Sequence, residues 1–362
     1  MPENLRPQTI LIVKLSAIGD VVQTLPMAEA LRRQFPEAQI DWLVEEEASD
    51  LLLGHPALNR VLVSRRKQWL KQLRQKGQRR LALQEIIKFL RLLRSIKYDW
   101  VIDNHGLFKS GLMVFLSKGR RKIGFQPSAG IADEGNYLFT KERYRPLSIE
   151  KHALERYLDL VHQLGVNVNK PVFKFPVSEG IREGVKSKLS QRGLSLGNLV
   201  VIHPLAKWPT KQWPKEKFAR LADNLINLGL TVVFTGSPED HQEIKGICRL
   251  MEHNAQNLNL AGQTGLRELA ALFSLANLVI TTDTGPMHLA AAVQAPLIVL
   301  FGPTAPWRTG PYGNGHVILR KNLPCSPCFQ RTCSAVRCME GISVEEVFAA
   351  AIKKMKTPNF NK

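Results

Sequence analysis

The sequence lacks any apolar run long enough to cross a membrane. No stretch of its 362 residues approaches the roughly 18 consecutive apolar residues of a spanning helix. The short apolar run at residues 10–13 is followed at once by Lys14, so we expect no signal peptide. These absences favour a protein that is soluble or that lies on a membrane surface.

Two common nucleotide-binding signatures are also missing. The glycine turns at residues 16–20 and 283–288 match neither the GxGxxG fingerprint of dinucleotide-binding proteins nor the Walker P-loop. Their absence argues against hydride transfer and against NTP hydrolysis. A composition of 44% hydrophobic and 22% charged residues, without low-complexity segments, is typical of a globular protein.

Acidic residues are few relative to basic ones: 31 Asp and Glu stand against 50 Lys and Arg, a net charge of +19. Much of the excess is local, because residues 65–97 hold twelve Lys or Arg and a single acid, Glu85. Such a patch indicates an acidic partner, namely a phosphorylated glycolipid, an anionic bilayer or a nucleic acid; a solvated helix face is the alternative. Only Trp69 and Phe89 could stack on bases there, which argues against nucleic acid.

Cysteine is rare, with five residues, yet four of them cluster as Cys325-x2-Cys328-x4-Cys333-x4-Cys338. Thiolates are good zinc ligands, but the second half of the cluster departs from the usual paired CxxC spacing. A structural zinc, a disulfide clip and packed free thiols are therefore all open.

Hydrophobic periodicity predicts two α/β domains, each a parallel sheet wrapped by helices. The expected strands are residues 9–14, 40–44, 60–63 and 100–102 in the first domain, and 199–202, 230–234, 278–281 and 297–301 in the second. Pro171 and Pro176 interrupt the periodicity between the two series. We therefore divide the chain into residues 1–175, 176–340 and a C-terminal helical segment, 341–362.

The first glycine turn supplies a candidate base. Gly19 permits close backbone approach, and Asp20 stands where the first strand passes into its helix. Backbone amides and the helix dipole favour the ionised form of a carboxylate at that place, and an ionised carboxylate can accept a proton. A plain helix cap is the alternative role for Asp20.

The second glycine turn has the features of an anion site. Asp283, Thr284, Gly285 and His288 lie at a strong helix start, where free N–H groups and the positive end of the helix dipole converge. A diphosphate fits such a site. The alternative is a helix that Asp283 or Thr284 merely caps.

Loops after two neighbouring strands carry further polar residues. Lys211 follows the strand at 199–202, and Glu239 and Asp240 follow the next strand. In one parallel sheet these loops would line one edge and offer a cation for phosphate oxygens and a carboxylate for ribose hydroxyls.

At these residues the chain resembles glycosyltransferase family 9, the ADP-heptose:lipopolysaccharide heptosyltransferases, over nearly its whole length. Residues 12–26 are similar to the opening signature of the family, and residues 279–289 are similar to its donor-site signature. Residues 41–46, 65–69 and 102–110 look most like the branch called heptosyltransferase I, which adds the first heptose to Kdo.

The resemblance implies a GT-B fold, in which two Rossmann-like domains face each other across a cleft and the C-terminal helix packs back on the first domain. It implies an inverting, metal-independent transfer of heptose from ADP-heptose to the Kdo-bearing inner core of lipopolysaccharide, with no cofactor and no nucleic-acid partner. It also implies a peripheral location at the anionic cytoplasmic face of the inner membrane, because the acceptor is anchored in lipid. Another family 9 transferase with a different core acceptor, and a nucleotide-sugar 2-epimerase of the same fold, are the alternatives.

The resemblance also assigns roles to individual residues. The general base would be Asp20, and Lys211 would balance charge on the leaving diphosphate. Donor binding would fall to Asp283, Thr284, Gly285 and His288, with Asp240 or its neighbour Glu239 on the ribose. The acceptor side would comprise Gly19, Arg65, Arg66 and Lys109.

Overall fold

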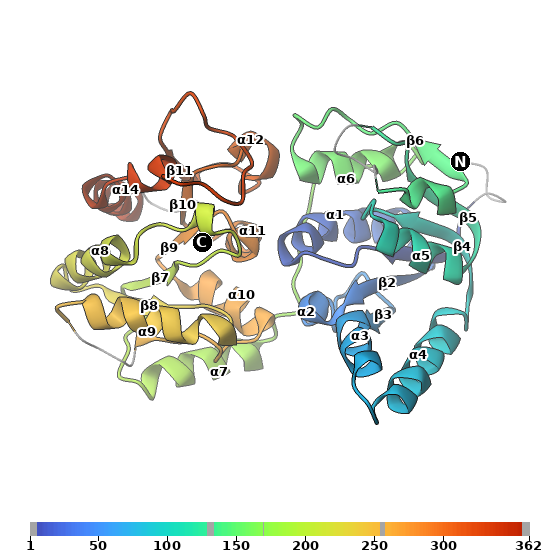
Figure 1. The fold of residues 1–362 in the computed structure, drawn as a ribbon, viewed down its shortest axis with the longest axis horizontal. Coiled ribbons are helices and arrows are strands. Elements are labelled where there is room, and N and C mark those ends of the chain that lie inside the picture. The colour runs from blue at the N-terminus through green and yellow to red at the C-terminus, as the bar shows by residue number, and fades with distance from the viewer. Residues whose placement is uncertain (1–5, 129–133, 169, 254–257, 357–362) are drawn as a thin grey trace. The chain divides into compact units, whose positions relative to one another are not determined.

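The computed structural model describes residues 6–128, 134–168, 170–253 and 258–356. It divides the chain into two α/β units, Met1–Pro176 and Val177–Lys362 (Figure 1). The division lies next to the predicted boundary at 175/176. The predicted class, α/β with two parallel sheets, is confirmed.

The first unit is built on a six-stranded parallel sheet in the order β3-β2-β1-β4-β5-β6. Its strands are β1 (Thr9–Val13), β2 (Gln39–Glu45), β3 (Arg60–Ser64), β4 (Lys97–Asp103), β5 (Lys118–Phe125) and β6 (Glu142–Tyr144). Its helices are α1 (Ile18–Gln34), α2 (Glu46–Ser49), α3 (Arg66–Arg74), α4 (Arg79–Leu93), α5 (Phe108–Leu116), the 3-10 helix η2 (Asn136–Phe139) and α6 (Ala153–His162). The four predicted strands are present. Two further strands, β5 and β6, were missed because β5 reads KGRRKIGF and β6 has three residues, so neither contains an apolar run.

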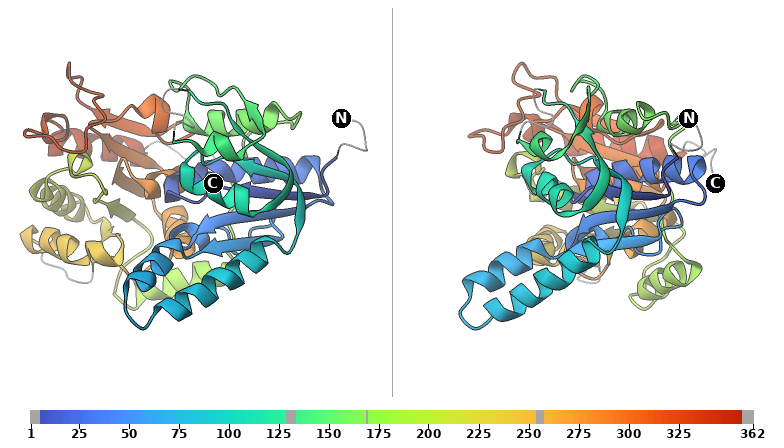
Figure 2. Two further views of the ribbon diagram at one scale, coloured as in Figure 1. Left: turned by 45° about the vertical axis from the view of Figure 1, so that its right-hand side comes forward. Right: turned by 90° about the vertical axis from the view of Figure 1, so that its right-hand side faces the viewer.

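Helices α3, α4 and α5 cover one face of this sheet. Apolar residues of β1 such as Leu11 and Val13 share a buried cluster with Trp69 of α3 and with Phe89 and Leu93 of α4. The Trp69 and Phe89 rings lie 5.2 Å apart between centroids. Figure 2 shows α3 and α4 running side by side beyond the sheet as a helical hairpin.

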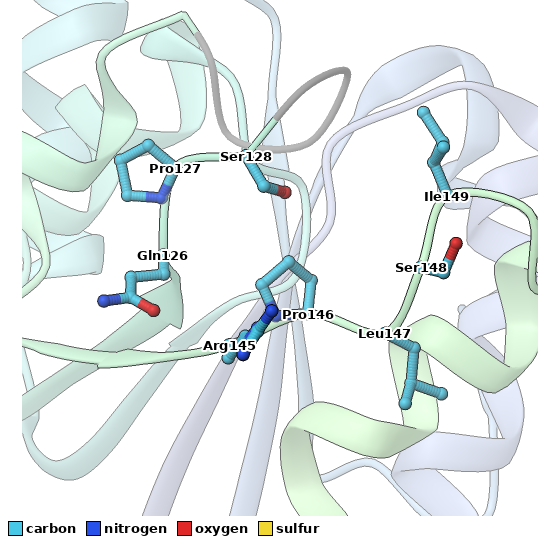
Figure 3. A pocket seen from close by; sticks show the side chains of 8 residues that line it. All are labelled: Gln126, Pro127, Ser128, Arg145, Pro146, Leu147, Ser148 and Ile149. Carbon is cyan, nitrogen blue, oxygen red and sulfur yellow. The ribbon is translucent and has the colours of Figure 1, made fainter.

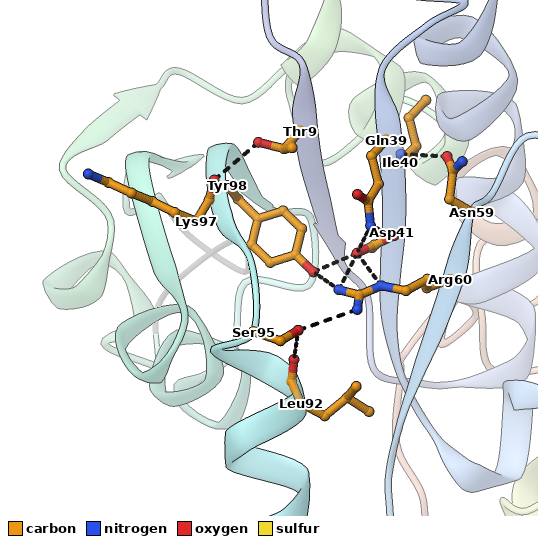
Figure 4. A network of polar contacts seen from close by, with 10 residues as sticks. All are labelled: Thr9, Gln39, Ile40, Asp41, Asn59, Arg60, Leu92, Ser95, Lys97 and Tyr98. Carbon is orange, nitrogen blue, oxygen red and sulfur yellow. Dashed lines mark hydrogen bonds and ion pairs between the residues drawn. The ribbon is translucent and has the colours of Figure 1, made fainter.

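A buried polar network ties four strands together at the amino edge of the same sheet (Figure 4). Asp41 of β2 is fully buried, and its Oδ2 accepts hydrogen bonds from the Tyr98 hydroxyl at 2.6 Å and from Arg60 Nη2 at 2.8 Å. Thr9 of β1 joins the network through the carbonyl oxygen of Lys97. These bonds satisfy a carboxylate that would otherwise be costly to bury.

The second unit is built on a five-stranded parallel sheet in the order β11-β10-β9-β7-β8. Its strands are β7 (Leu199–His203), β8 (Thr231–Phe234), β9 (Leu278–Thr282), β10 (Leu297–Phe301) and β11 (Val317–Arg320). Its helices are α7 (Glu179–Ser190), α8 (Lys215–Asn227), α9 (His241–Leu250), α10 (Leu266–Leu275), α11 (Gly285–Ala292), α12 (Pro306–Thr309), α13 (Arg337–Glu340) and α14 (Val344–Lys356), with the 3-10 helices η3 (Pro209–Lys211) and η4 (Pro238–Asp240). All four predicted strands are present, and β11 at the edge was missed.

The expected C-terminal helix is α14. It packs on α8 and on β9, β10 and β11, all of which belong to the second unit. Its predicted contact with the first domain stays a prediction. Among the helices of the described ranges, none has both the length and the apolar character needed to cross a bilayer.

Candidate active site

The predicted site residues lie at the carboxyl edges of the two sheets. In the first unit β1 and β4 are neighbours, and the chain winds away from them in opposite directions; the loops after two such strands form the usual ligand position of an open α/β sheet. Gly19 and Asp20 follow β1, and Lys109 follows β4. The second unit repeats the pattern with β7 and β9, which are followed by Lys211 and Asp283.

Asp20 is the third residue of α1, and both oxygens of its carboxylate are hydrogen-bonded. Oδ2 accepts from the backbone N–H of Ala17, the residue before the helix, at 3.1 Å, and Oδ1 accepts from the Tyr157 hydroxyl at 2.6 Å. Burial alone would raise the pKa of Asp20, but the positive charge of Lys14 and these two hydrogen bonds lower the pKa below its usual value. Asp20 therefore helps to cap the helix and also remains an ionised group able to accept a proton.

The loop after β4 approaches the same turn. Lys109 Nζ donates to Ser16 Oγ at 2.7 Å, and the buried Lys14 donates from Nζ to the backbone oxygen of Asn104 at 3.0 Å. Burial and the nearby lysines lower the pKa of His105 to about 2, so this imidazole is neutral near pH 7. The positive charge around Asp20 thus comes from lysines and not from histidine.

Glu45, the last residue of β2, collects two of the three predicted acceptor-binding cations. Lys109 Nζ lies 3.4 Å from Glu45 Oε2, and Arg66 Nη2 lies 3.1 Å from Glu45 Oε1. Arg65 is half-exposed and pairs instead with Glu46, with Nε 2.9 Å from Oε1. The structure therefore brings Arg66 and Lys109 together and holds Arg65 in a separate ion pair.

An ion pair between a partly buried lysine and a buried aspartate joins two predicted site residues of the second unit. Lys211 Nζ lies 2.6 Å from Asp283 Oδ2, and the same oxygen accepts a hydrogen bond from Thr304 Oγ1 at 2.5 Å. The Lys211 ammonium also lies 4.5 Å from the centroid of the Trp208 ring. These contacts fix a cation at the sheet edge, where it can interact with a phosphate.

The helix that follows Asp283 begins at Gly285, with Thr284 at the cap position. The Thr284 side chain makes no capping hydrogen bond, so that side chain leaves the first N–H groups of α11 available to a ligand. His288 stands in the first turn of the same eight-residue helix. The Thr284 side chain therefore does not cap α11.

Of the two candidate ribose-binding acids, Asp240 is the one that is held in place. Its Oδ2 accepts hydrogen bonds from the backbone N–H of Ser237 at 2.7 Å and from Ser237 Oγ at 2.8 Å. A Cβ on Gly236 would lie 2.9 Å from Asp240 Cβ, so this approach needs glycine. Glu239 is exposed beside it.

A cavity of about 490 Å³ lies after β5 and β6, where no site residue was predicted (Figure 3). It is lined by Gln126, Arg145 and Ser148, among others, and Arg145 supplies a positive charge at its wall. The cavity therefore adds room for a polar or anionic group at the carboxyl edge of the first sheet.

A second cavity, of about 230 Å³, is lined by the four clustered cysteines Cys325, Cys328, Cys333 and Cys338. All four are free thiols in the structure. The part of the chain that the structure describes contains no group of three or more Cys, His, Asp or Glu side chains that could hold a metal ion. Cys325, Cys328 and Cys333 are exposed and Cys338 is partly exposed, so the thiols line this surface cavity, and a structural zinc, a disulfide clip and free thiols stay the three alternatives for the cluster.

The chain has two α/β units, each built on a parallel sheet. One unit has a candidate base at the carboxyl edge of its sheet, and the other has a candidate diphosphate site there. This combination is typical of the GT-B class of glycosyltransferases. The family model "Glycosyltransferase family 9 (heptosyltransferase)" matches residues 86–338. The chain belongs to glycosyltransferase family 9 and is a heptosyltransferase.

Similar proteins cover nearly the whole chain. Lipopolysaccharide heptosyltransferase 1 of Pseudomonas aeruginosa is 32% identical over 334 residues, which cover 90% of this chain and 87% of that protein. Lipopolysaccharide heptosyltransferase 2 of Salmonella typhimurium is 29% identical over 324 residues, covering 86% and 87%. Among solved structures, E. coli heptosyltransferase WaaC with ADP matches with a TM-score of 0.75 and 24% identity, covering 96% of this chain and 99% of that one. This last likeness confirms the GT-B fold.

Several residues that contact the predicted ones were not predicted as site residues, among them Glu45, Tyr157 and Thr304, and neither was Lys14, whose charge acts on Asp20. A signal existed for Lys14, because a lysine that ends a buried apolar strand needs anionic or polar partners. The sequence carries no such signal for Tyr157 and Thr304, because their partners Asp20 and Asp283 lie 137 and 21 residues away along the chain.

Proposed function

We propose that this heptosyltransferase adds heptose from ADP-heptose to the Kdo region of the lipopolysaccharide inner core, with inversion at the anomeric carbon and without a metal. Heptose transfer from ADP-heptose to the inner core is the activity that the family and its lipopolysaccharide relatives define. The choice of Kdo rests on the branch resemblance, since relatives named heptosyltransferase 1 and heptosyltransferase 2 are similarly close. Because the family match is to transferases, we do not propose 2-epimerisation.

The observation that carries the mechanism is the ionised, doubly hydrogen-bonded carboxylate of Asp20. In this mechanism Asp20 accepts the proton of the acceptor hydroxyl, and the freed oxygen forms a bond to the anomeric carbon of the heptose. The bond from that carbon to the ADP oxygen breaks at the same time, and its electron pair leaves with ADP. Attack from the face opposite the leaving group inverts the anomeric centre.

The leaving diphosphate gains negative charge in this step, and the second unit offers the groups to stabilise it. Lys211 supplies a positive charge, and the N–H groups of Thr284 and Gly285 stand at the positive end of α11. His288 and Asp283 complete the donor side, and the carboxylate of Asp240 binds the ribose hydroxyls. Because Asp283 already neutralises Lys211, the diphosphate has to compete with a carboxylate for this ammonium.

On the acceptor side, Gly19 leaves room beside the base, and Arg65, Arg66 and Lys109 bind the carboxylates and phosphates of the glycolipid. Arg and Lys suit this task because both anions are recognised by charge and by N–H donors. A lipid-anchored acceptor also requires the protein to work at the cytoplasmic face of the inner membrane, as a peripheral protein.

Replacing Asp20 by Asn removes the base and keeps the size of the side chain. We expect the transfer rate to fall by roughly 10² to 10⁴, the usual contribution of general base catalysis. The dissociation constant for ADP, measured by calorimetry, should not change, because the donor residues are in the other unit. Asp159→Asn, a substitution of the same kind on α6, should keep normal turnover. Ordinary turnover in Asp20→Asn would rule out the proposed base.

A further inference from the structure

Tyr157 reaches Asp20 from a distant part of the chain. It belongs to α6, which packs along α1, and its hydroxyl donates to Asp20 Oδ1 at 2.6 Å. Burial and the neighbouring carboxylate raise the pKa of Tyr157 well above its usual value, so the hydroxyl keeps its proton. The bond is a charge-assisted one of the short, strong kind.

Lys14 supports this tyrosine. Its Nζ lies 3.7 Å from the centroid of the Tyr157 ring and donates to the backbone oxygen of Asn104 at 3.0 Å. An ammonium over an aromatic face is attracted by the electron-rich ring, more strongly where water is excluded. Burial lowers the pKa of Lys14 to about 8 although the charges of Asp20 and Asp103 oppose this, so Lys14 is mostly protonated at pH 7.

In the ranges that the structure describes, Tyr157 is the hydroxyl that donates to the Asp20 carboxylate, and the other groups near it are charged or titratable side chains. His105, from the loop after β4, is neutral near pH 7, and Arg156 of α6 and Lys109 of α5 add positive charge near Lys14. Asp103 is buried behind them, and burial raises its pKa. Of the contacts to Asp20, those from Tyr157 and Ala17 are hydrogen bonds.

We propose that Tyr157, braced by Lys14, is a positioning residue for the proposed base: its hydroxyl anchors Asp20 Oδ1 so that Oδ2 receives the acceptor proton. The argument rests on the proposed role of Asp20. With Oδ1 held by Tyr157 and Oδ2 by the backbone N–H of Ala17, the carboxylate has one orientation available, and the second lone pair of Oδ2 is left for the acceptor proton. The hydrogen bond from Tyr157 also favours the ionised carboxylate over the protonated one.

Tyr157→Phe tests the proposal, because it deletes the hydroxyl and keeps the ring that Lys14 contacts. We expect kcat to fall about tenfold, in line with loss of a hydrogen bond to a charged group, and the acidic limb of the kcat–pH profile to move to higher pH. The Michaelis constant for ADP-heptose should stay unchanged. Tyr137→Phe, which keeps the ring beside Arg143, is the matched control and should behave as wild type.

Two comparisons separate failure of this proposal from failure of the mechanism. If Asp20→Asn is inactive but Tyr157→Phe has an unmoved acidic limb, the positioning role is wrong and the base stands. If Asp20→Asn keeps its turnover, the base itself is wrong. Should Tyr157→Phe melt well below wild type, the kcat–pH profiles of both proteins are measured at a temperature below the melting point of the variant, and an unmoved acidic limb there contradicts the proposal.

Discussion

At the residue scale, burial decides which side chains at the two sheet edges carry charge. It lowers the pKa of His203 to about 4, and, with the nearby lysines, it lowers that of His105 to about 2, so neither imidazole is protonated near pH 7. By contrast, Lys14, Lys109 and Lys211 lie beside carboxylates. The cations beside the carboxylates at these edges are therefore lysines and not protonated histidines.

His203 provides a stability prediction. It is buried at the end of β7, with Nδ1 3.0 Å from Thr235 Oγ1. Between pH 6.5 and pH 4 the unfolded chain binds a proton at this site and the folded chain does not, so the free energy of unfolding falls as the pH falls through this window. The loss should amount to about 3 kcal/mol.

Urea unfolding of wild type and of His203→Asn at pH 7 and pH 4 measures this contribution. The variant should lose about 3 kcal/mol less than wild type over the same range. The exposed His162, replaced by Asn, serves as the control and should lose as much as wild type. Equal losses in all three proteins would show that His203 titrates normally in the folded state.

At the element scale, the α3–α4 hairpin concentrates the basic character of the chain. The cations at its start are paired with acids at the end of β2 and in α2: Arg66 with Glu45, Arg65 with Glu46, and Lys67 with Glu47. The exposed cations further along are Lys71, Arg74, Lys76, Arg79, Arg80, Lys88, Arg91 and Arg94. Between them the aliphatic side chains Leu70, Leu81, Leu83, Ile87 and Leu92 are 44 to 52% exposed.

Exposed aliphatic side chains among cations are the features of a surface that binds an anionic bilayer. We expect Lys88→Glu with Arg91→Glu to lower binding to vesicles of mixed phosphatidylglycerol and phosphatidylcholine at least tenfold, at about 1 kcal/mol for each cation removed. Co-sedimentation of each protein with these vesicles measures the binding. Transfer to a water-soluble Kdo acceptor should be unchanged.

The same charge change in the second unit, Lys215→Glu with Arg249→Glu, is the control. If both double variants lose vesicle binding equally, net charge and not the hairpin determines membrane contact. If neither loses it, the hairpin does not bind the bilayer.

The elements show what periodicity can and cannot predict. Strands that are buried on both faces, such as β7 and β10, have continuous apolar runs and were found. The edge strand β6 and the charged β5 have no such run, because no residue of β6 is buried and only the last three residues of β5 are. The contact of α6 with α1, which brings Tyr157 to Asp20, is a tertiary contact that no local pattern encodes.

At the scale of the whole molecule, the two sheets differ in strand order, yet both have their polar candidate residues beyond the carboxyl ends of the strands. In each unit the central candidate residues, Asp20 and Lys109 or Lys211 and Asp283, follow the two strands from which the chain winds in opposite directions, whereas Arg65 and Arg66 follow β3 and Asp240 follows β8. This placement explains why two short glycine turns, far apart in the sequence, could be assigned to the base and to the diphosphate site. The side chains that tune these groups come from helices and loops whose placement depends on packing.

Mass spectrometry of the reaction products tests the central claim most directly. Purified protein with ADP-heptose and Kdo-lipid A should give lipid that is heavier by one heptose residue, together with an equal amount of ADP, and Asp20→Asn should give almost none of either. An unchanged acceptor mass, with ADP-heptose bound but not consumed or with UDP-N-acetylglucosamine converted to its 2-epimer, would contradict the account.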